Sequence, residues 1–317
     1  MKLPEKFISC DWGTTNFRLR LIETKSLKIL SEHSTDMGIK KCFQEFKEQS
    51  SVSQDQFFAK YLKHQIKNLD GKISNDYIIV ASGMLSSSIG MHELNYANMP
   101  LAFNGKDLIS KYIPFDDMPD LLLVSGAKTD SDVMRGEEVQ AIGLAKELAK
   151  HEKGILLLPG THCKHIAFET GVFKDFTTYM TGELFDTISK HTILSASLTP
   201  AAWDVSFQDI FLEGVKKGLA DQQMQSLFAI RANTLINQVS GEQNFYFLSG
   251  LMIGGELASL QNQTGTIFLA ASGIYSILYK LALESFLPTE QIVCFEEQIL
   301  EKALLTGQQQ ILRTYAE

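Results

Sequence analysis

The chain has 317 residues, a formal net charge of −8 and an apolar content of 44%. This length exceeds the usual size of one hydrophobic core, so the sequence predicts two domains of about 150 residues each. The negative charge is thinly spread and no basic stripe accompanies it, which argues against nucleic acid or an anionic membrane as the main partner.

The longest apolar stretch, residues 267–283, is interrupted by small and polar residues. It predicts a buried strand followed by a helix rather than a membrane span. The N-terminus lacks the apolar core of a signal peptide, so a cytoplasmic protein is expected.

The cysteines share no short spacing and are expected to be reduced thiols. Cys163 stands between His162 and Lys164, whose charge favours a lowered thiol pKa, and a catalytic cysteine there is the minority interpretation.

The first predicted element is a β-hairpin with strands at residues 7–10 and 17–22. Its turn consists of Gly13, Thr14, Thr15 and Asn16. The glycine allows close approach to an anion, while hydroxyl, amide and backbone N–H groups are donors to phosphate oxygens. Asp11, at the end of the first strand, is suited to hold Mg²⁺ directly or through its waters. The same residue types are ordinary turn formers, so a purely structural hairpin is the alternative.

The remaining first half predicts alternating strands and helices. They are a strand at 28–34, a helix at 54–68, strands at 77–81 and 121–125, and a helix at 136–150. The loop 82–90 between the two later strands is rich in serine and glycine. Its hydroxyl groups, including those of Ser86 and Ser87, suit a polyhydroxylated substrate, although a simple connector explains them equally well.

The segment 130–140 is dense in charge at a junction between a loop and a helix. Glu137 and Glu138 in a first helical turn favour the helix dipole, and Arg135 can pair with either carboxylate. Beside a cleft between two domains, one carboxylate would accept the proton of an attacking hydroxyl. Arg135 would bind a substrate carboxylate in bidentate fashion. The functional interpretation is favoured over plain helix initiation because the segment lies between the two predicted domains.

The second half repeats the opening pattern of the first, which indicates a duplicated domain. It predicts strands at 155–158, 163–168 and 172–180, a helix from residue 181, helices at 209–219 and 222–239, an element at 245–260, a strand at 267–271 and a closing helix at 296–315. Gly160 and Thr161 form the second turn. His162 and Lys164 follow with a spacing that directs both to one face, toward a phosphate. Solvent-facing polar residues at a strand end are the alternative.

No Gly-x4-Gly-Lys-Ser/Thr loop and no Gly-x-Gly-x-x-Gly turn occurs in the sequence. A nucleotide would therefore be held by the two Gly-Thr hairpins, with a third glycine-bearing turn between a strand and a helix beside the adenosine. This turn is expected at residues 270–273, which end in Gly273, or else at Ser249 and Gly250. Close helix packing explains the same small residues equally well.

Six segments together resemble the 2-dehydro-3-deoxygalactonokinases, sugar-acid kinases of the actin-like ATPase superfamily. They are residues 11–16, 82–84, 133–140, 159–164, 180–183 and 248–251. The resemblance implies an α/β fold of two RNase H-like domains with an interdomain catalytic cleft. Residues 1–150 would form the first domain and residues 151–317 the second, with the last helix packing back on the first.

The resemblance also implies an activity, which is ATP- and Mg²⁺-dependent phosphorylation of the 6-hydroxyl of 2-dehydro-3-deoxy-D-galactonate. It assigns Asp11 to the metal, both hairpin turns to the phosphates, and Glu137 or Glu138 to the catalytic base. Arg135 is expected to bind the sugar-acid carboxylate. The chain has Gly90-Met91-His92 where the family usually has Gly-Trp, which leaves the exact sugar acid open.

Two other functions are weighed against this one. A phosphohydrolase of the exopolyphosphatase kind would release phosphate without a sugar acceptor, but the low basic charge disfavours a long polyanion. A sugar-acid sensor would keep the fold without turnover, but Asp11, Glu137, Glu138 and Lys164 together disfavour it. The sequence leaves the oligomeric state open, with a homodimer as one option.

Overall fold

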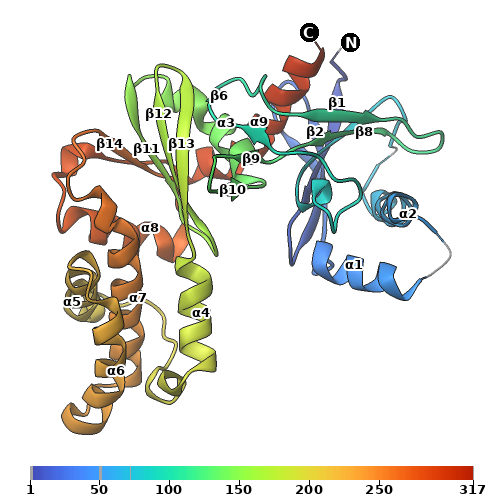
Figure 1. Cartoon of the computed structure of the whole chain (residues 1–317). Coiled ribbons are helices and arrows are strands. Elements are labelled where there is room, and N and C mark those ends of the chain that lie inside the picture. The colour runs from blue at the N-terminus through green and yellow to red at the C-terminus, as the bar shows by residue number, and fades with distance from the viewer. Residues whose placement is uncertain (1–2, 50–51, 72, 317) are drawn as a thin grey trace. The chain divides into compact units, whose positions relative to one another are not determined.

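The computed structural model describes residues 3–49, 52–71 and 73–316. They form two compact units, each of which combines a sheet with helices (Figure 1). Unit 1 comprises Met1–Glu152, Glu169–Asp175 and Gln298–Glu317, and unit 2 comprises Lys153–Phe168 and Phe176–Glu297. Within the described residues, no helix combines the length and the apolar character that crossing a membrane requires.

Unit 1 is built on a six-stranded sheet with the order β3-β2-β1-β4-β8-β7. The strands are β1 (Lys6–Trp12), β2 (Phe17–Glu23), β3 (Ile29–Thr35), β4 (Ile78–Gly83), β7 (Ser110–Ile113) and β8 (Asp120–Val124). β1 pairs with β2 in antiparallel fashion and with β4 in parallel fashion, so it is the central strand. Its residues Phe7, Ile8 and Cys10 are fully buried, as expected for a strand covered on both faces.

The helices of unit 1 are α1 (Ile39–Glu48), α2 (Gln54–Ile66), α3 (Glu137–Leu148) and most of α9 (Glu297–Ala316). Short elements complete the unit: η1 (Met84–Ser86), β5 (Ala97–Asn98), β6 (Leu101–Ala102), β9 (Ala127–Lys128) and β10 (Val133–Met134). α2 begins at a capping box formed by Ser53 and Gln56, which is a strong local start signal. α1 begins without a side-chain cap, and the sequence did not predict it.

Two glycines allow α3 and α9 to pack backbone against backbone. A Cβ atom at Gly143 would lie 1.8 Å from the Ala303 carbonyl oxygen, and one at Gly307 would lie 1.9 Å from the Val139 carbonyl oxygen. The neighbouring Gln308 side chain donates to the carbonyl oxygen of Cys10 at 3.3 Å. α9 therefore joins the start of α3 to the end of β1.

Unit 2 repeats the strand order of unit 1. Its sheet runs β15-β14-β11-β12-β13, where unit 1 has β8-β4-β1-β2-β3. The strands are β11 (Lys153–Leu158), β12 (Cys163–Glu169), β13 (Val172–Tyr179), β14 (Thr266–Leu269) and β15 (Ile292–Cys294). Residues 172 and 173 of β13 belong to unit 1, where they pair with β6. The repeated order is that of an RNase H-like domain, and the predicted α/β fold class is confirmed.

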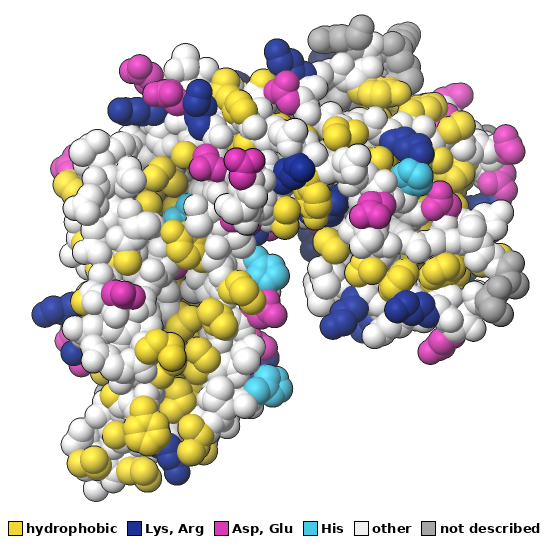
Figure 2. Space-filling view, in the orientation of Figure 1, with side chains coloured by type: hydrophobic (Ala, Val, Ile, Leu, Met, Phe, Trp, Pro, Cys, Tyr) yellow, Lys and Arg dark blue, Asp and Glu magenta, His cyan; other side chains and the backbone are white. Residues whose placement is uncertain are grey.

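The helices of unit 2 form a layer below its sheet in the view of Figure 1. They are α4 (Thr181–His191), α5 (Gln208–Leu219), α6 (Gln223–Asn237), α7 (Gly241–Leu257) and α8 (Gly273–Glu284), with short turns η2 (Ile193–Ser197), η3 (Val205–Phe207), η4 (Ala258–Leu260) and η5 (Thr289–Gln291). α7 is buried along most of its length. Figure 2 shows hydrophobic side chains gathered on the surface of this layer. On α6 the exposed ones are Met224, Phe228, Leu235 and Ile236.

Candidate functional site

The first predicted phosphate turn is held from behind by the start of α1. The amides of Gly38, Ile39 and Lys40 donate to the carbonyl oxygens of Thr15, Gly13 and Thr14 at 3.2, 2.9 and 3.2 Å. A Cβ atom at Gly38 would lie 2.3 Å from the Thr14 carbonyl oxygen, so only glycine allows this approach. The side chains of Thr14, Thr15 and Asn16 are exposed. With its carbonyl groups occupied, the turn is left with hydroxyl and amide donors for an anion.

Asp11 lies one residue before the end of β1, where it pairs with Ser82 of β4 and Arg18 of β2. Burial raises the pKa of its carboxyl group, and Arg18 and Arg20 counteract that effect. Within the described residues its carboxylate takes no hydrogen bond, and no group of three or more potential metal-ligating side chains is found. Mg²⁺ is usually bound by one or two carboxylates with waters and phosphates, so a single available carboxylate fits this ion.

The ends of β1 and β4 meet the start of α3 at two glycines. Gly83 has a φ of 86°, and a Cβ atom there would lie 3.1 Å from the Trp12 carbonyl oxygen. Gly136 has a φ of 117°, and a Cβ atom there would lie 3.6 Å from the Cα atom of Gly83. Both φ values favour glycine. Asp11 and the acidic start of α3 therefore come from elements that converge within unit 1.

Glu138 is the most perturbed carboxyl group at this junction. Its side chain is 2% exposed, and both carboxylate oxygens lie 2.8 Å from the amide nitrogen of Gly136. Burial, with the charge of Glu137 adding to it, raises the Glu138 pKa to about 8. Glu137 is only partly buried and accepts a hydrogen bond from the Arg135 amide at 3.1 Å. A carboxyl group with a pKa near neutrality is suited to exchange a proton during catalysis.

Arg135 is held in place by the loop after β4. Its Nη1 donates to the carbonyl oxygen and to the hydroxyl of Ser86 at 2.7 and 2.6 Å, and its guanidinium lies 4.2 Å from the centre of the Tyr96 ring. Ser86 and Ser87 are both buried, and the Ser87 hydroxyl donates to the Met84 carbonyl oxygen at 2.7 Å. The observed contacts of these serines are thus with the protein, and direct substrate binding by them stays a prediction.

The second predicted phosphate turn lies in unit 2. Thr161 and His162 are exposed, and His162 Nε2 lies 2.5 Å from the Glu183 carboxylate. Lys164 is only 3% exposed, and its ammonium donates to the His162 carbonyl oxygen at 3.1 Å. Although the two side chains are two residues apart, one meets solvent and the other is buried. The shared face of His162 and Lys164 toward a phosphate therefore stays a prediction.

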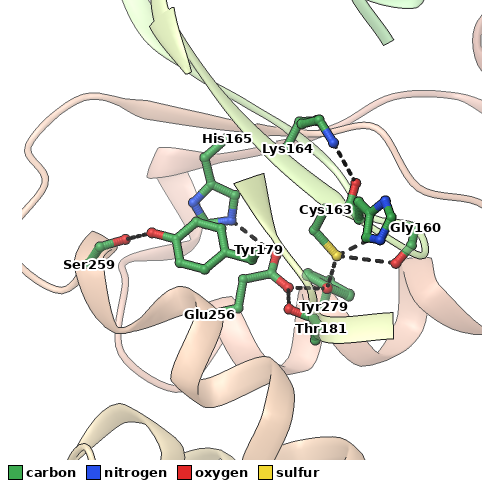
Figure 3. A network of polar contacts seen from close by, with 10 residues as sticks. Gly160, Cys163, Lys164, His165, Tyr179, Thr181, Glu256, Ser259 and Tyr279 are labelled. Carbon is green, nitrogen blue, oxygen red and sulfur yellow. Dashed lines mark hydrogen bonds and ion pairs between the residues drawn. The ribbon is translucent and has the colours of Figure 1, made fainter. Parts of the chain in front are cut away.

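Cys163 is buried within a polar network beneath this turn (Figure 3). Its Sγ lies 3.4 Å from the amide nitrogen of Gly160 and 3.2 Å from the Tyr279 hydroxyl. Burial, with the Glu256 charge adding to it, raises the pKa of the thiol to about 11. Burial and the Glu256 charge both disfavour the thiolate, so the structure does not support the minority interpretation of a catalytic cysteine.

A cavity of about 230 Å³ lies beside the second turn, within unit 2. It is lined mainly by apolar and aromatic side chains, together with Gly160, Thr181, Gly182 and Ser249. The aromatic residues of its wall are Phe185, Phe245, Tyr246, Tyr275 and Tyr279. A mostly apolar pocket with few polar groups is typical of a small-molecule site. Sequence reasoning missed these aromatic residues, because they come from three helices, α4, α7 and α8, and share no local motif.

The two candidates for a third glycine turn have different outcomes. Gly273 follows β14 and begins α8 with a φ of 57°, so the predicted turn between a strand and a helix is present there. Gly250 lies inside α7, and a Cβ atom there would lie 2.0 Å from the Phe211 carbonyl oxygen of α5. A turn at Ser249 and Gly250 is thus wrong, because the glycine serves the contact between two helices.

Comparison with known proteins gives matches to one family over nearly the whole chain. The family described as 2-keto-3-deoxy-galactonokinase matches residues 11–306. The chain is 30% identical to a proposed 2-dehydro-3-deoxygalactonokinase of Rhizobium meliloti (strain 1021) over 292 residues, which cover 88% of this chain and 89% of the relative. It is 28% identical to the 2-dehydro-3-deoxygalactonokinase of Escherichia coli (strain K12) over 289 residues, which cover 89% of this chain and 91% of the relative.

A solved structure is similar as well. The crystal structure of a proposed 2-dehydro-3-deoxygalactonokinase from Sinorhizobium meliloti superposes with a TM-score of 0.78 at 27% identity, covering 95% of this chain and 94% of that chain. The sequence match and the structural match both extend over unit 1 and unit 2. This chain belongs to the 2-keto-3-deoxy-galactonokinase family.

Proposed function

We propose that this protein uses ATP and Mg²⁺ to phosphorylate the 6-hydroxyl of 2-dehydro-3-deoxy-D-galactonate. The family match supports a sugar-acid kinase. The observation that carries the proposal is the junction in unit 1, where the buried Glu138 lies at the start of α3 beside the ends of β1 and β4. A proton acceptor, a metal-binding carboxylate and an arginine are the groups that phosphoryl transfer to a sugar acid requires.

The acceptor hydroxyl would be oriented by a glutamate at the start of α3. As its oxygen bonds to the γ-phosphorus of ATP, the bond from that phosphorus to the bridging oxygen of ADP breaks, and the hydroxyl proton passes to the carboxylate. The raised pKa favours Glu138 over Glu137 as this base, because a carboxylate with a pKa near 8 binds the released proton more strongly.

Arg135 is proposed to bind the carboxylate of the sugar acid. Ser86 occupies only one of its terminal nitrogens, and the Tyr96 ring supports the plane of the guanidinium. A guanidinium fixed in this way loses little freedom when it forms a bidentate pair with a carboxylate. The preference for one sugar acid over its epimers depends on the loop 82–92 in this proposal.

The phosphates are proposed to bind at the two glycine turns, and Asp11 is the residue that would hold Mg²⁺. The bound ion would neutralise charge on the β- and γ-phosphates. Thr14, Thr15 and Asn16 would donate from the first turn, and Gly160, Thr161, His162 and Lys164 would contribute from the second. The aromatic cavity beside Gly160, with Gly273 at the start of α8, would receive the adenosine. The cytoplasm is the proposed location, because all four cysteines are free thiols.

The deciding experiment is a coupled assay of ADP release with ATP and Mg²⁺. It is run with 2-dehydro-3-deoxy-D-galactonate, with the gluconate epimer and without sugar. We expect release that depends on the galactonate acid. Equal release in all three reactions would instead indicate a phosphohydrolase, and nucleotide binding without release would indicate a sensor.

A further inference from the structure

One buried carboxylate in unit 2 is not accounted for by the groups described so far. Glu256 lies near the end of α7 and is 3% exposed. It does not line the cavity, yet its carboxylate contacts side chains from three other parts of the unit (Figure 3). These are His165 of β12, Thr181 at the start of α4 and Tyr279 of α8. A buried carboxylate with three hydrogen-bond partners fixes the relative positions of the side chains that surround it.

The direction of each hydrogen bond follows from the chemistry of the groups. An ionised carboxylate only accepts, so all three partners must donate to it. Tyr279 donates to Oε2 at 2.7 Å, Thr181 donates to the same oxygen, and His165 Nε2 lies 3.0 Å from Oε1. Within the described residues, the buried Nδ1 of His165 has no hydrogen-bond partner, so Glu256 alone orients this ring through a hydrogen bond.

The network continues from Tyr279 to the second glycine turn. Because the Tyr279 proton is directed to Glu256, its oxygen is free to accept from the Cys163 thiol at 3.2 Å. The Cys163 sulfur in turn lies 3.4 Å from the amide nitrogen of Gly160. An unbroken chain of polar contacts thus runs from the Glu256 carboxylate to the turn that is proposed to bind phosphate.

We propose that Glu256 is a positioning residue for the nucleotide. Three members of its network, Gly160, Thr181 and Tyr279, line the cavity, and each comes from a different element. Glu256 fixes the positions of these cavity-lining residues relative to one another and does not contact the nucleotide itself. The proposal rests on the proposed function, in which this cavity and turn receive ATP. It predicts that the carboxylate matters for nucleotide affinity and much less for the chemical step.

The test compares three substitutions in the intact protein. Glu256→Gln keeps the size of the side chain but removes its charge and replaces one acceptor oxygen by a donor, so at least one of the three bonds must be lost or must reverse its direction. Tyr279→Phe removes one bond and the connection to Cys163. Ser259→Ala is the matched control, because among the described residues the Ser259 hydroxyl forms its hydrogen bond with the Tyr179 hydroxyl, at the exposed edge of the network. The measurements are kcat, KM for ATP, KM for the sugar acid, ADP affinity by calorimetry and the thermal midpoint.

We expect Glu256→Gln to raise KM for ATP and the Kd for ADP about tenfold, and Tyr279→Phe to raise them about threefold. In both, kcat and KM for the sugar acid should stay within about twofold, and Ser259→Ala should match the unsubstituted protein. A lowered thermal midpoint with unchanged KM for ATP would show a purely structural role and overturn the proposal. If Glu256→Gln does not fold, Tyr279→Phe decides in the same way. Failure of the unsubstituted protein to bind ADP would refute the proposed function instead.

Discussion

At the scale of single residues, two carboxyl groups of unit 1 are subject to opposing effects on their ionisation. Burial disfavours the ionised form, while nearby positive charge or a helix dipole favours it. Glu138 lies in the first turn of α3, where the helix dipole favours a negative charge, but burial disfavours that charge more strongly. Asp11 shows the same conflict at the end of β1, with two arginines that reduce it only in part. Carboxyl groups whose pKa values are shifted by burial and by neighbouring charges are typical of functional sites.

The pKa of Glu138 predicts a pH dependence of both activity and stability. As a base Glu138 must be ionised, so kcat should rise with pH through about 8. Its folded pKa lies above the ordinary value of 4.5, so the folded state binds the proton more tightly. Stability should therefore fall as pH rises from about 5 to about 8.

Substitution of each glutamate separates the two candidates for the base. Glu138→Gln should abolish turnover and flatten the dependence of the thermal midpoint on pH. Glu137→Gln should keep a rise of kcat with pH but move it to lower pH, because the Glu137 charge helps to raise the Glu138 pKa. Rate profiles and melting curves between pH 5 and pH 9 provide the measurement. A profile that Glu138→Gln leaves unchanged would refute Glu138 as the base.

Replacement of Asp11 separates folding from function. Because burial raises its pKa, the ionised carboxylate does not stabilise the fold, and Asp11→Asn should melt at the same temperature as the unsubstituted protein or higher. Turnover should fall by about two orders of magnitude or more, and the rise in melting temperature that Mg²⁺ and ADP produce should be smaller. Asp36→Asn, at an exposed carboxylate paired with Lys41, is the control. Near-normal turnover of Asp11→Asn would refute the metal assignment.

At the scale of elements, glycines have two different uses that the sequence alone does not separate. At Gly250 and Gly307 a Cβ atom would meet a backbone oxygen of another helix, at 2.0 and 1.9 Å. At Gly160 a Cβ atom would meet no atom of the described residues within 4 Å, and the φ angle does not require glycine. The space at Gly160 is therefore left open by the protein, as expected where a ligand approaches the backbone.

Gly307→Ala should destabilise the protein by about 2 kcal/mol, because α9 must move away from α3 to make room for the methyl group. Urea denaturation measures the free energy of unfolding. Gly265→Ala, where the added Cβ would lie 4.0 Å from its nearest neighbour, should differ little from the unsubstituted protein. Equal stability of Gly307→Ala and Gly265→Ala would contradict the close helix contact.

Gly160→Ala should affect nucleotide binding and leave stability unchanged, unlike Gly307→Ala. The melting temperature should stay unchanged, since no other residue in the described part of the chain would contact the added methyl group. KM for ATP should rise about tenfold, because the methyl group would occupy the proposed approach of a phosphate. A loss of stability without a change in KM would indicate that the turn has only a structural role.

Sequence patterns predicted these elements well where the local signal was strong. The helix expected at 54–68 is α2 (Gln54–Ile66), which begins at a capping box, and the helix expected at 136–150 is α3. α1 was missed, because its start is stabilised by contacts with the first hairpin rather than by a cap of its own. The burial of Lys164 and Cys163 was missed as well, because neighbours in sequence do not reveal what packs over a strand.

At the scale of the whole molecule, the repeated Gly-Thr turns indicated a duplicated domain, and the two units have the same order of five strands. The aromatic cavity was not foreseen, since its wall is assembled from helices far apart in the sequence.

The two tryptophans provide one fluorescent probe in each unit. Trp12 is buried in unit 1, and Trp203 packs against Tyr246 of the cavity wall in unit 2.

Variants that keep one tryptophan should report ligand binding separately. ADP should change the emission of the protein that keeps Trp203, because Trp203 contacts the cavity wall, and the change should be much smaller in the protein that keeps Trp12. Titrations of Trp12→Phe and Trp203→Phe with ADP measure this. A larger response from the protein that keeps Trp12 would contradict the aromatic cavity as the adenosine site.

The position of α9 has a consequence for biosynthesis. Residues 298–317 complete unit 1, where Gln308 and Gln309 donate to the carbonyl oxygens of Cys10 and Thr24. A ribosome makes the chain from its first residue, so unit 2 is fully synthesised before the last helix of unit 1 emerges. The first domain to be translated is thus the last to be finished, and its uncovered surface needs protection from aggregation throughout translation.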